Sequence, residues 1–194
     1  MNELIVKGKY MQLRDWFQGN LDELREMLGG ITPVDDSHLG EIILLAERVF
    51  VVGQGRTGLV TKMFAMRLMQ IGLDTYIVGE TLTPAIRSGD LLIAASGSGE
   101  TPGVVRAAQK AKAMGARVAV ITSAAQSSLA QYADHLTVLP GESIKISAQV
   151  STKLPLANAL EQTALIFLDC VVAWLAAQKG ETNQSMMSRH ANLE

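Results

Sequence analysis

The pattern of apolar positions changes period several times along the chain, which indicates alternating strands and helices. Five short, nearly unbroken apolar runs are typical of strands buried on both faces: RVFVVG, DTYIVG, DLLIAAS, RVAVITS and HLTVLP. Apolar residues at helical spacing separate several of them, as in TGLVTKMFAMRLMQIG and TPGVVRAAQKAKAMGA, and SSLAQYA predicts a short helix. The alternation predicts an α/β fold: a mostly parallel five-stranded sheet covered by helices on both faces, a three-layer αβα sandwich.

Helices are also expected at both ends of the chain. Helical spacing is found from residue 3 to 29, TPVDDS reads as a loop, and a short helix is expected through Ile42 to Ala46. A long helix is expected from about Pro155 to Gln178, followed by a polar tail without periodicity. We therefore expect one domain over residues 1–194, with a helical lead-in over 1–34, a core of about 35–180 and a tail over 180–194.

The charge balance and the single cysteine narrow the possible functions. Lys and Arg total 17 against 19 Asp and Glu, a net charge of -2, so the sequence predicts no basic field for nucleic acid or for an anionic membrane. Cys170 is expected to be a buried thiol, and a lone cysteine suits a reducing cytoplasm. No signal peptide or anchor is expected at the N-terminus. TALIFLDCVVAWLAAQ falls short of the roughly 20 residues that span a bilayer, and it reads as a buried helix.

Two glycine-rich turns follow predicted strands, where parallel sheets bind their ligands. GQGRTG, residues 53 to 58, has the G-x-G-x-x-G spacing of a dinucleotide-binding turn. SGSGETP, residues 96 to 102, adds the hydroxyls of Ser96, Ser98 and Thr101. Glycines let backbone N–H groups approach an anion, and each following helix presents its positive end. The two turns therefore predict an anion site at one edge of the sheet.

The anion could belong to a dinucleotide or to a single terminal phosphate. Glu80 follows the next strand, about where a ribose-binding acid would stand. Arg56 and the hydroxyls of the second turn favour a single phosphate instead, and the chain leaves no room for a substrate domain. Tight turns that bind no ligand are the remaining alternative.

VVGQGRTG and AASGSGETP, with their separation, resemble the sugar isomerase (SIS) domain family over about residues 35–180. Within it, VGETLTPAI, LEQTALIFLD and the terminal MSRHANLE are most similar to the 6-phospho-3-hexuloisomerases. The resemblance implies a flavodoxin-like SIS fold and the interconversion of D-arabino-hex-3-ulose 6-phosphate and fructose 6-phosphate through an enediol. That chemistry requires a base and a donor to the oxygens, without a metal or redox cofactor.

The expected catalytic residues are Glu161, His190 and Arg56. Glu161 opens an apolar helix, where desolvation would raise its proton affinity, although a carboxylate that stabilises the helix N-terminus is the alternative. His190 is assigned through the resemblance, as proton shuttle or carbonyl donor, because a histidine in a polar tail is ordinarily solvated. Arg56 would stabilise enediolate oxygens or the phosphate. The expected substrate ligands are Gly53, Gly55, Thr57, Ser96, Gly97, Ser98, Gly99 and Thr101, with Thr83, Ser151 and Lys153 as weaker candidates.

The expected partners are a small phosphosugar and further copies of the chain. The helix TKMFAMRLMQ is apolar around most of its circumference, so one face can cover the sheet and another a second chain. The resemblance implies a homotetramer with sites near subunit boundaries, and the tail is hypothesised to complete a neighbouring site. A non-catalytic phosphosugar-binding module, an isomerase of another phosphosugar and an NAD oxidoreductase are the rival functions. The sequence does not decide which pathway the activity would serve, formaldehyde fixation by the ribulose monophosphate pathway or the supply of pentoses.

Overall fold

The centre of the protein is a five-stranded sheet in the order β2-β1-β3-β4-β5. The computed structural model describes residues 12–31, 33–141 and 158–193. All four strand pairs are parallel, which confirms the predicted sheet. The strands are β1 (Val49–Val52), β2 (Thr75–Ile77), β3 (Leu91–Ala95), β4 (Arg117–Thr122) and β5 (His135–Val138).

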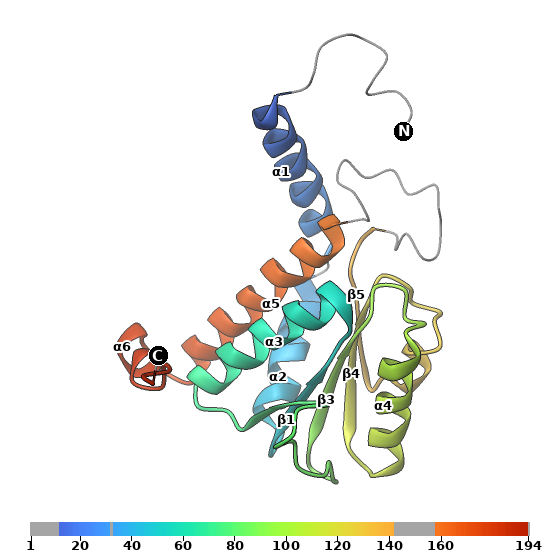
Figure 1. Ribbon diagram of the computed structural model, residues 1–194, viewed down its shortest axis with the longest axis vertical. Helices are drawn as coiled ribbons and strands as arrows, with labels where there is room; N and C mark the ends of the chain where they lie inside the picture. The colour runs from blue at the N-terminus through green and yellow to red at the C-terminus, as the bar shows by residue number, and fades with distance from the viewer. Residues whose placement is uncertain (1–11, 32, 142–157, 194) are drawn as a thin grey trace.

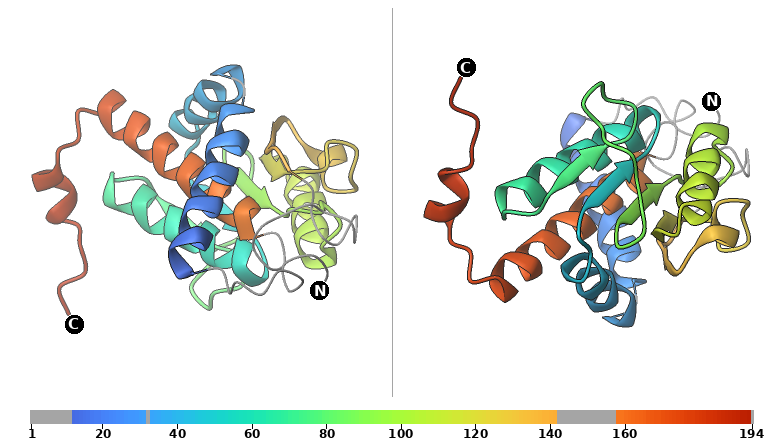
Figure 2. Two further views of the ribbon diagram at one scale, coloured as in Figure 1. Left: turned by 90° about the horizontal axis from the view of Figure 1, so that it is seen from above. Right: turned by 90° about the horizontal axis from the view of Figure 1, so that it is seen from below.

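Helices cover both faces of the sheet, as the unbroken apolar strands predict (Figures 1 and 2). Along β1, Val49 and Val51 join one hydrophobic cluster, while Phe50 and Val52 join another on the opposite face. The first cluster is completed by α2 (Pro33–Leu44), α3 (Gly55–Gln70) and α5 (Asn158–Gln178). The second is completed by α4 (Pro102–Ala113) and lies against the short 3-10 helix η1 (Ala130–Tyr132). The three-layer αβα arrangement is therefore confirmed.

Two segments expected to be irregular are helical. Residues 33–37 of the TPVDDS segment lie within α2, which begins at Pro33 because proline is preset for the first helical position and needs no N–H there. In the tail, α6 (Asn183–Met187) begins where the Thr182 hydroxyl accepts a hydrogen bond from the Ser185 N–H, and the Ser185 side chain reaches back to Thr182. Such a capping box is local and leaves no apolar periodicity. At the other end, α1 (Leu13–Gly29) packs on α5 and extends beyond the body of the fold (Figure 1).

Helix α5 is the long, buried helix expected near the C-terminus. By length and composition alone, residues 159–179 could cross a membrane, so the expectation that the apolar stretch is too short was wrong. Half of that stretch is buried inside the protein, through residues such as Phe167, Leu168 and Val171. Cys170 lies on the outward side of the helix and is exposed, which corrects the expected buried thiol.

Candidate active site

The two predicted anion turns meet at the carboxyl ends of β1 and β3. In this strand order the chain leaves β1 toward β2 and leaves β3 toward β4, so the connections diverge and open a crevice between the two strands. The side chain of Gln54, in the first turn, lies against Gly103 at the start of α4. A Cβ on Gly103 would come within 2.4 Å of Gln54 Nε2, so glycine permits the contact between the two turns.

The first turn brings the start of α3 directly onto the end of β1. A Cβ on Gly58 would lie 2.8 Å from the Gly53 carbonyl oxygen, and Gly55 has a φ of 61°. Gln54 precedes the helix, and within the described part of the chain its side chain makes no capping hydrogen bond. The first N–H groups of α3 are therefore free of helical partners, as an anion-binding helix end requires.

The second turn holds its hydroxyls in fixed positions. Ser96 and Ser98 are buried, and the Ser96 Oγ lies 2.9 Å from the Thr101 Oγ1. The Ser98 Oγ accepts a hydrogen bond from the Glu100 N–H at 3.3 Å. Helix α4 begins immediately afterwards, at Pro102. The three predicted hydroxyls thus surround one turn in front of a helix N-terminus.

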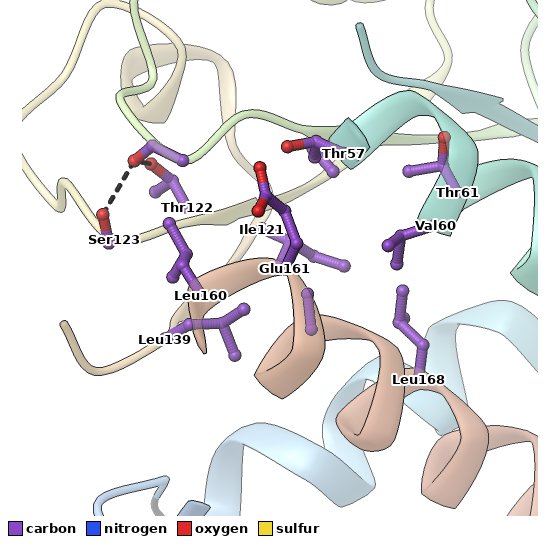
Figure 3. Close-up of a pocket in the computed structure, with 13 residues that line it drawn as sticks. Thr57, Val60, Thr61, Ile121, Thr122, Ser123, Leu139, Leu160, Glu161 and Leu168 are labelled. Carbon is purple, nitrogen blue, oxygen red and sulfur yellow. Dashed lines mark hydrogen bonds between the residues drawn. The ribbon is translucent and has the colours of Figure 1, made fainter. Parts of the chain in front are cut away.

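The end of β4 and the segment after it clamp the second turn in place. The Thr122 and Ser123 hydroxyls donate to the Gly97 carbonyl oxygen at 3.1 and 2.8 Å (Figure 3). The Glu100 carboxylate accepts from the N–H and the hydroxyl of Ser128, both at 2.7 Å, and these bonds hold the pKa of that carboxyl below its usual range. Sequence analysis missed this clamp, although VITSAAQSS places hydroxyls after a strand as the second turn does.

Glu161 lies in the first turn of α5, and its carboxylate borders a pocket between the two turns (Figure 3). The polar lining comes from Thr57 of the first turn, Thr61 of α3, Gly97 of the second turn, Thr122 at the end of β4 and Ser123 after it. The rest of the lining is apolar: Val60, Ala95, Ile121, Leu139, Leu160, Ala164 and Leu168. The pocket therefore combines three expected site residues, Glu161, Thr57 and Gly97, with three polar residues that were not expected, Thr61, Thr122 and Ser123.

The electrostatic surroundings of Glu161 suit a proton-transferring group. Its side chain is 21% exposed, and burial raises the pKa of the carboxyl. The Arg56 guanidinium opposes this rise, with Nε 3.4 Å from Glu161 Oε2. A partly desolvated carboxylate beside one cation, in a pocket, is a typical functional arrangement.

His190 is not brought to Glu161 within one chain. Glu161 is at the start of α5, whereas His190 follows α6, beyond the other end of α5 (Figure 1). From residue 161 to its end at Gln178, α5 alone is about 26 Å long. His190 is exposed, and its Nδ1 donates to the Ala191 carbonyl oxygen at 3.0 Å, which leaves Nε2 as the acceptor of the neutral ring.

Of the weaker candidates, the structure describes Thr83 alone, and it does not join the pocket. The Thr83 hydroxyl donates to the Ile77 carbonyl oxygen at 2.5 Å, and Thr83 borders a separate pocket with Phe50 and Lys110 on the α4 side of the sheet. Ser151 and Lys153 lie outside the described residues. The structure therefore assembles the two turns, Arg56 and Glu161, while Thr83 and His190 lie elsewhere in the same chain.

Comparisons with known proteins identify the domain family that the sequence motifs resemble. Residues 42–166 match the family model of the SIS domain. The chain is 38% identical over 185 residues to a Bacillus subtilis protein named 3-hexulose-6-phosphate isomerase, covering 95% of this chain and 100% of that protein. It is 38% identical over 173 residues to a Mycobacterium gastri protein of the same name, covering 89% and 87%. The similarity thus extends well beyond the matched domain.

Solved structures agree with the sequence comparisons. A crystal structure of a Methanococcus jannaschii protein, for which a 3-hexulose-6-phosphate isomerase function has been inferred, aligns with a TM-score of 0.78 at 33% identity. The alignment covers 95% of this chain and 100% of that one. The arrangement of strands and helices is therefore similar over nearly the whole chain.

Proposed function

The chain belongs to the SIS domain family, and from this premise we propose that it is a phosphosugar isomerase that interconverts D-arabino-hex-3-ulose 6-phosphate and fructose 6-phosphate. The observation that carries the proposal is the Glu161 carboxylate beside the second anion turn, in one pocket. The two relatives named 3-hexulose-6-phosphate isomerase support the choice of sugar. A module that only binds phosphosugars would not need a partly buried base there.

The phosphate of the substrate is proposed to bind at the second turn. The N-terminus of α4 provides a positive helix end, and Ser96, Ser98 and Thr101 provide hydroxyls. Because Ser96 and Thr101 share one hydrogen bond, one of the two hydroxyl hydrogens stays available to a phosphate oxygen. Gly97 and Gly99 keep side chains away from the approaching anion.

The proton transfer is assigned to Glu161. The carboxylate removes the proton from carbon 2 of the 3-hexulose, a 2,3-enediolate forms, and the same proton is returned to carbon 3 while the carbonyl moves to carbon 2. Arg56, 3.4 Å from the carboxylate, is placed to stabilise the enediolate oxygens. His190 is assigned to proton exchange at those oxygens.

His190 is proposed to reach this site from a second copy of the chain. Helix α3 begins at the site, with Arg56, and ends at Gln70, whose carbonyl oxygen contacts Arg189 beside His190. Between these ends α3 exposes Leu59, Met63 and Met66, which are 64%, 46% and 44% exposed. If two copies pack α3 antiparallel through this stripe, a two-fold axis places the tail of each copy at the Glu161 of the other.

A tetramer made of two such pairs completes the proposed assembly, with sites near subunit boundaries. We place the protein in the cytoplasm, where a phosphosugar substrate would be formed and consumed. The ribulose monophosphate route of formaldehyde fixation is the proposed setting, because it produces a 3-hexulose 6-phosphate.

The test is the conversion of enzymatically generated 3-hexulose 6-phosphate to fructose 6-phosphate by the wild type, Glu161→Gln and the control Glu80→Gln. Glu80 is an exposed acid paired with Lys62 outside the pocket. We expect Glu161→Gln to lose about a hundredfold or more in kcat, as for a removed acid–base group, and Glu80→Gln to remain active. A wild type that binds phosphosugars but leaves this substrate unchanged would refute the isomerase and favour a binding module or another sugar.

A further inference from the structure

Arg189 fastens the C-terminal tail to the end of α3. Its Nη1 donates to the Gln70 carbonyl oxygen at 3.0 Å, although the two residues are 119 positions apart in the chain. The last carbonyl groups of a helix carry partial negative charge and lack helical partners, so a guanidinium is a favourable cap there. Arg189 thus joins the tail to the helix whose other end forms the site.

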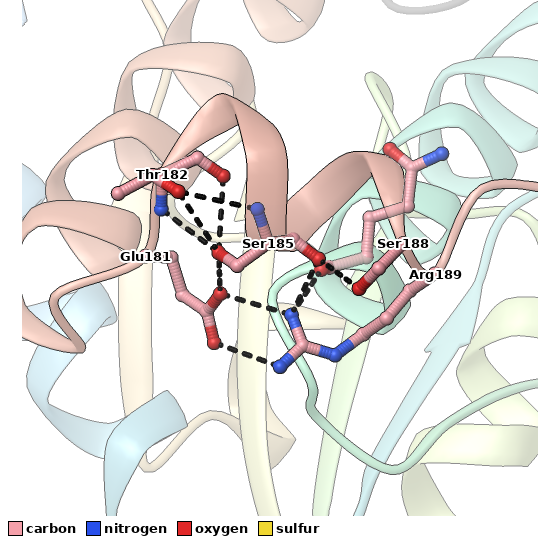
Figure 4. A network of polar contacts seen from close by, with 6 residues as sticks. Glu181, Thr182, Ser185, Ser188 and Arg189 are labelled. Carbon is pink, nitrogen blue, oxygen red and sulfur yellow. Dashed lines mark hydrogen bonds and ion pairs between the residues drawn. The ribbon is translucent and has the colours of Figure 1, made fainter.

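The tail itself holds the guanidinium from the other side (Figure 4). Glu181 receives two charge-assisted hydrogen bonds from Arg189, at 2.9 and 3.1 Å, and a further one from the Ser185 hydroxyl. The Arg189 and Ser185 bonds hold the pKa of the Glu181 carboxyl below its usual range. Arg189 also donates to the Ser185 carbonyl oxygen at 3.3 Å, and the Ser188 hydroxyl donates to the same oxygen at 2.7 Å. The guanidinium is therefore held in one orientation.

The end of α3 is shaped to accept this guanidinium. The chain turns after α3 at Gly72, which has a φ of 77°. A Cβ there would lie 3.3 Å from Arg189 Cζ. Glycine at this position therefore lets the guanidinium lie flat against the turn, in addition to permitting the backbone conformation.

We propose that Arg189 is the positioning residue for His190: by fixing the tail to the end of α3, it sets the place and direction from which His190 reaches the site of a second copy. The inference rests on the proposed function, because it gives Arg189 an effect on turnover only through His190. The next residue in the chain, His190, contacts Ala191 of its own tail at 3.0 Å, and this local bond is no anchor comparable with that of Arg189.

The alternative is that Arg189 only holds the tail to the fold. In that case its removal would lower stability without changing the chemical step. Catalytic geometry is more sensitive, because a displacement of about 1 Å in a catalytic group can lower the rate a hundredfold. The two roles therefore differ in whether kcat falls in a protein that remains folded and assembled.

The experiment compares Arg189→Ala, Arg189→Lys, Glu181→Gln, His190→Ala and the double variant with both alanines, and uses Arg106→Ala as the control. Arg106 is an exposed arginine of α4, on the other side of the sheet. The measurements are kcat, KM, oligomeric state and the thermal midpoint of unfolding. Arg189→Lys and Glu181→Gln keep the test valid if Arg189→Ala does not fold.

We expect Arg189→Ala to lose about tenfold or more in kcat with little change in KM, and Arg189→Lys and Glu181→Gln to lose less. The double variant should be no slower than His190→Ala, because Arg189 acts through that histidine. Either of two results would refute the positioning role and leave the proposed function standing. One is a double variant whose loss in kcat is the product of the two single losses. The other is an Arg189→Ala variant that keeps full kcat while His190→Ala is impaired. Full activity in His190→Ala would refute the proposed role of His190 and the inference with it, while loss in Glu161→Gln would still support the isomerase.

Discussion

Arg56 Nε lies 3.4 Å from Glu161 Oε2, although 105 positions separate the two residues in the chain. They meet because α3 and α5 pack side by side and both begin at the same edge of the sheet. The contact joins the first glycine-rich turn to the carboxylate of the pocket. It also makes the protonation of Glu161 depend on Arg56, because burial raises the pKa of Glu161 and Arg56 opposes that rise.

Arg56→Ala should therefore move the pH dependence of the reaction. A base must be unprotonated, so activity is lost as the pH falls through the pKa of Glu161. Without the guanidinium that pKa rises further, and the acid limb of the kcat/KM profile should shift to higher pH. The rate itself should fall about a hundredfold if Arg56 also stabilises the enediolate. Arg56→Lys should shift the limb less, and an acid limb that does not move in Arg56→Ala would contradict the coupling.

Gly99→Ala should disrupt the second turn. Gly99 has a φ of 66°, and a Cβ there would lie 1.9 Å from the Ser127 Oγ, so Ser127 would have to move. Gly180→Ala is the matched control, because its φ is 67° but a Cβ there meets no atom of the described residues within 4 Å. Both variants should lose about 1 kcal/mol or more of unfolding free energy to backbone strain, and Gly99→Ala should also weaken phosphosugar binding. Unchanged binding by Gly99→Ala, measured by calorimetry, would argue against a phosphate at this turn.

Mixing two inactive variants should restore activity if each site takes Glu161 from one copy and His190 from another. After unfolding and refolding together, an equal mixture of Glu161→Gln and His190→Ala should reach about a quarter of the wild-type rate, because random assembly gives one site in four both intact groups. A mixture that stays inactive, although each variant assembles, would place both groups in the same subunit.

Met63→Glu should separate the copies. Met63 is 46% exposed in the single chain, so the change should have little effect on the stability of the subunit. A charge in the centre of an apolar contact would nevertheless oppose association. Sedimentation should show a smaller species, and activity should fall with it. Met114→Glu, at a residue 50% exposed on the other side of the sheet, is the control that should leave assembly unchanged.

Asp90→Asn should destabilise the fold without touching the site. Asp90 is completely buried, and it accepts hydrogen bonds from Arg48 at 2.9 and 2.6 Å and from the Arg87 N–H at 2.8 Å. Burial opposes ionisation, but these bonds outweigh it and lower the pKa of Asp90. The stabilisation is therefore present above the unfolded pKa of about 3.9 and is lost as the pH falls through the folded value.

At neutral pH the amide introduced by Asp90→Asn would face Arg48 with a donor, and we expect a loss of about 3 kcal/mol in unfolding free energy. Glu47→Gln, in the exposed pair with Arg87, should cost less than about 1 kcal/mol. Urea unfolding at pH 7 and at a pH below the unfolded value of about 3.9 measures the loss of unfolding free energy for each substitution. An equal effect of the two substitutions would show that the burial of Asp90 does not matter.

The sequence was sufficient to predict the sheet, the position of the two turns between strands and helices, and the place of Glu161 in the first turn of a helix, because each depends on a local pattern: apolar runs, glycines after strands, and an acid at a helix start. It missed Thr122 and Ser123, whose function arises only because β4 lies next to β3. The sequence also could not show that His190 lies beyond the far end of α5, because a motif does not determine how far its residues lie from the pocket in the folded chain. Helix α6 depends on a cap rather than on apolar periodicity.

The packing of the second turn limits which amino-acid substitutions proteins descended from this one can accept. Gly99 has no room for a side chain, and the turn is held through the main chain of Gly97, so few substitutions at these two positions would preserve the phosphate site proposed for this turn. The side of the pocket formed by Thr57 of α3 and Leu160 of α5 consists of side chains instead. The proposed function therefore implies that substitutions of these side chains change which sugar is accepted, while the proposed contact with phosphate is kept.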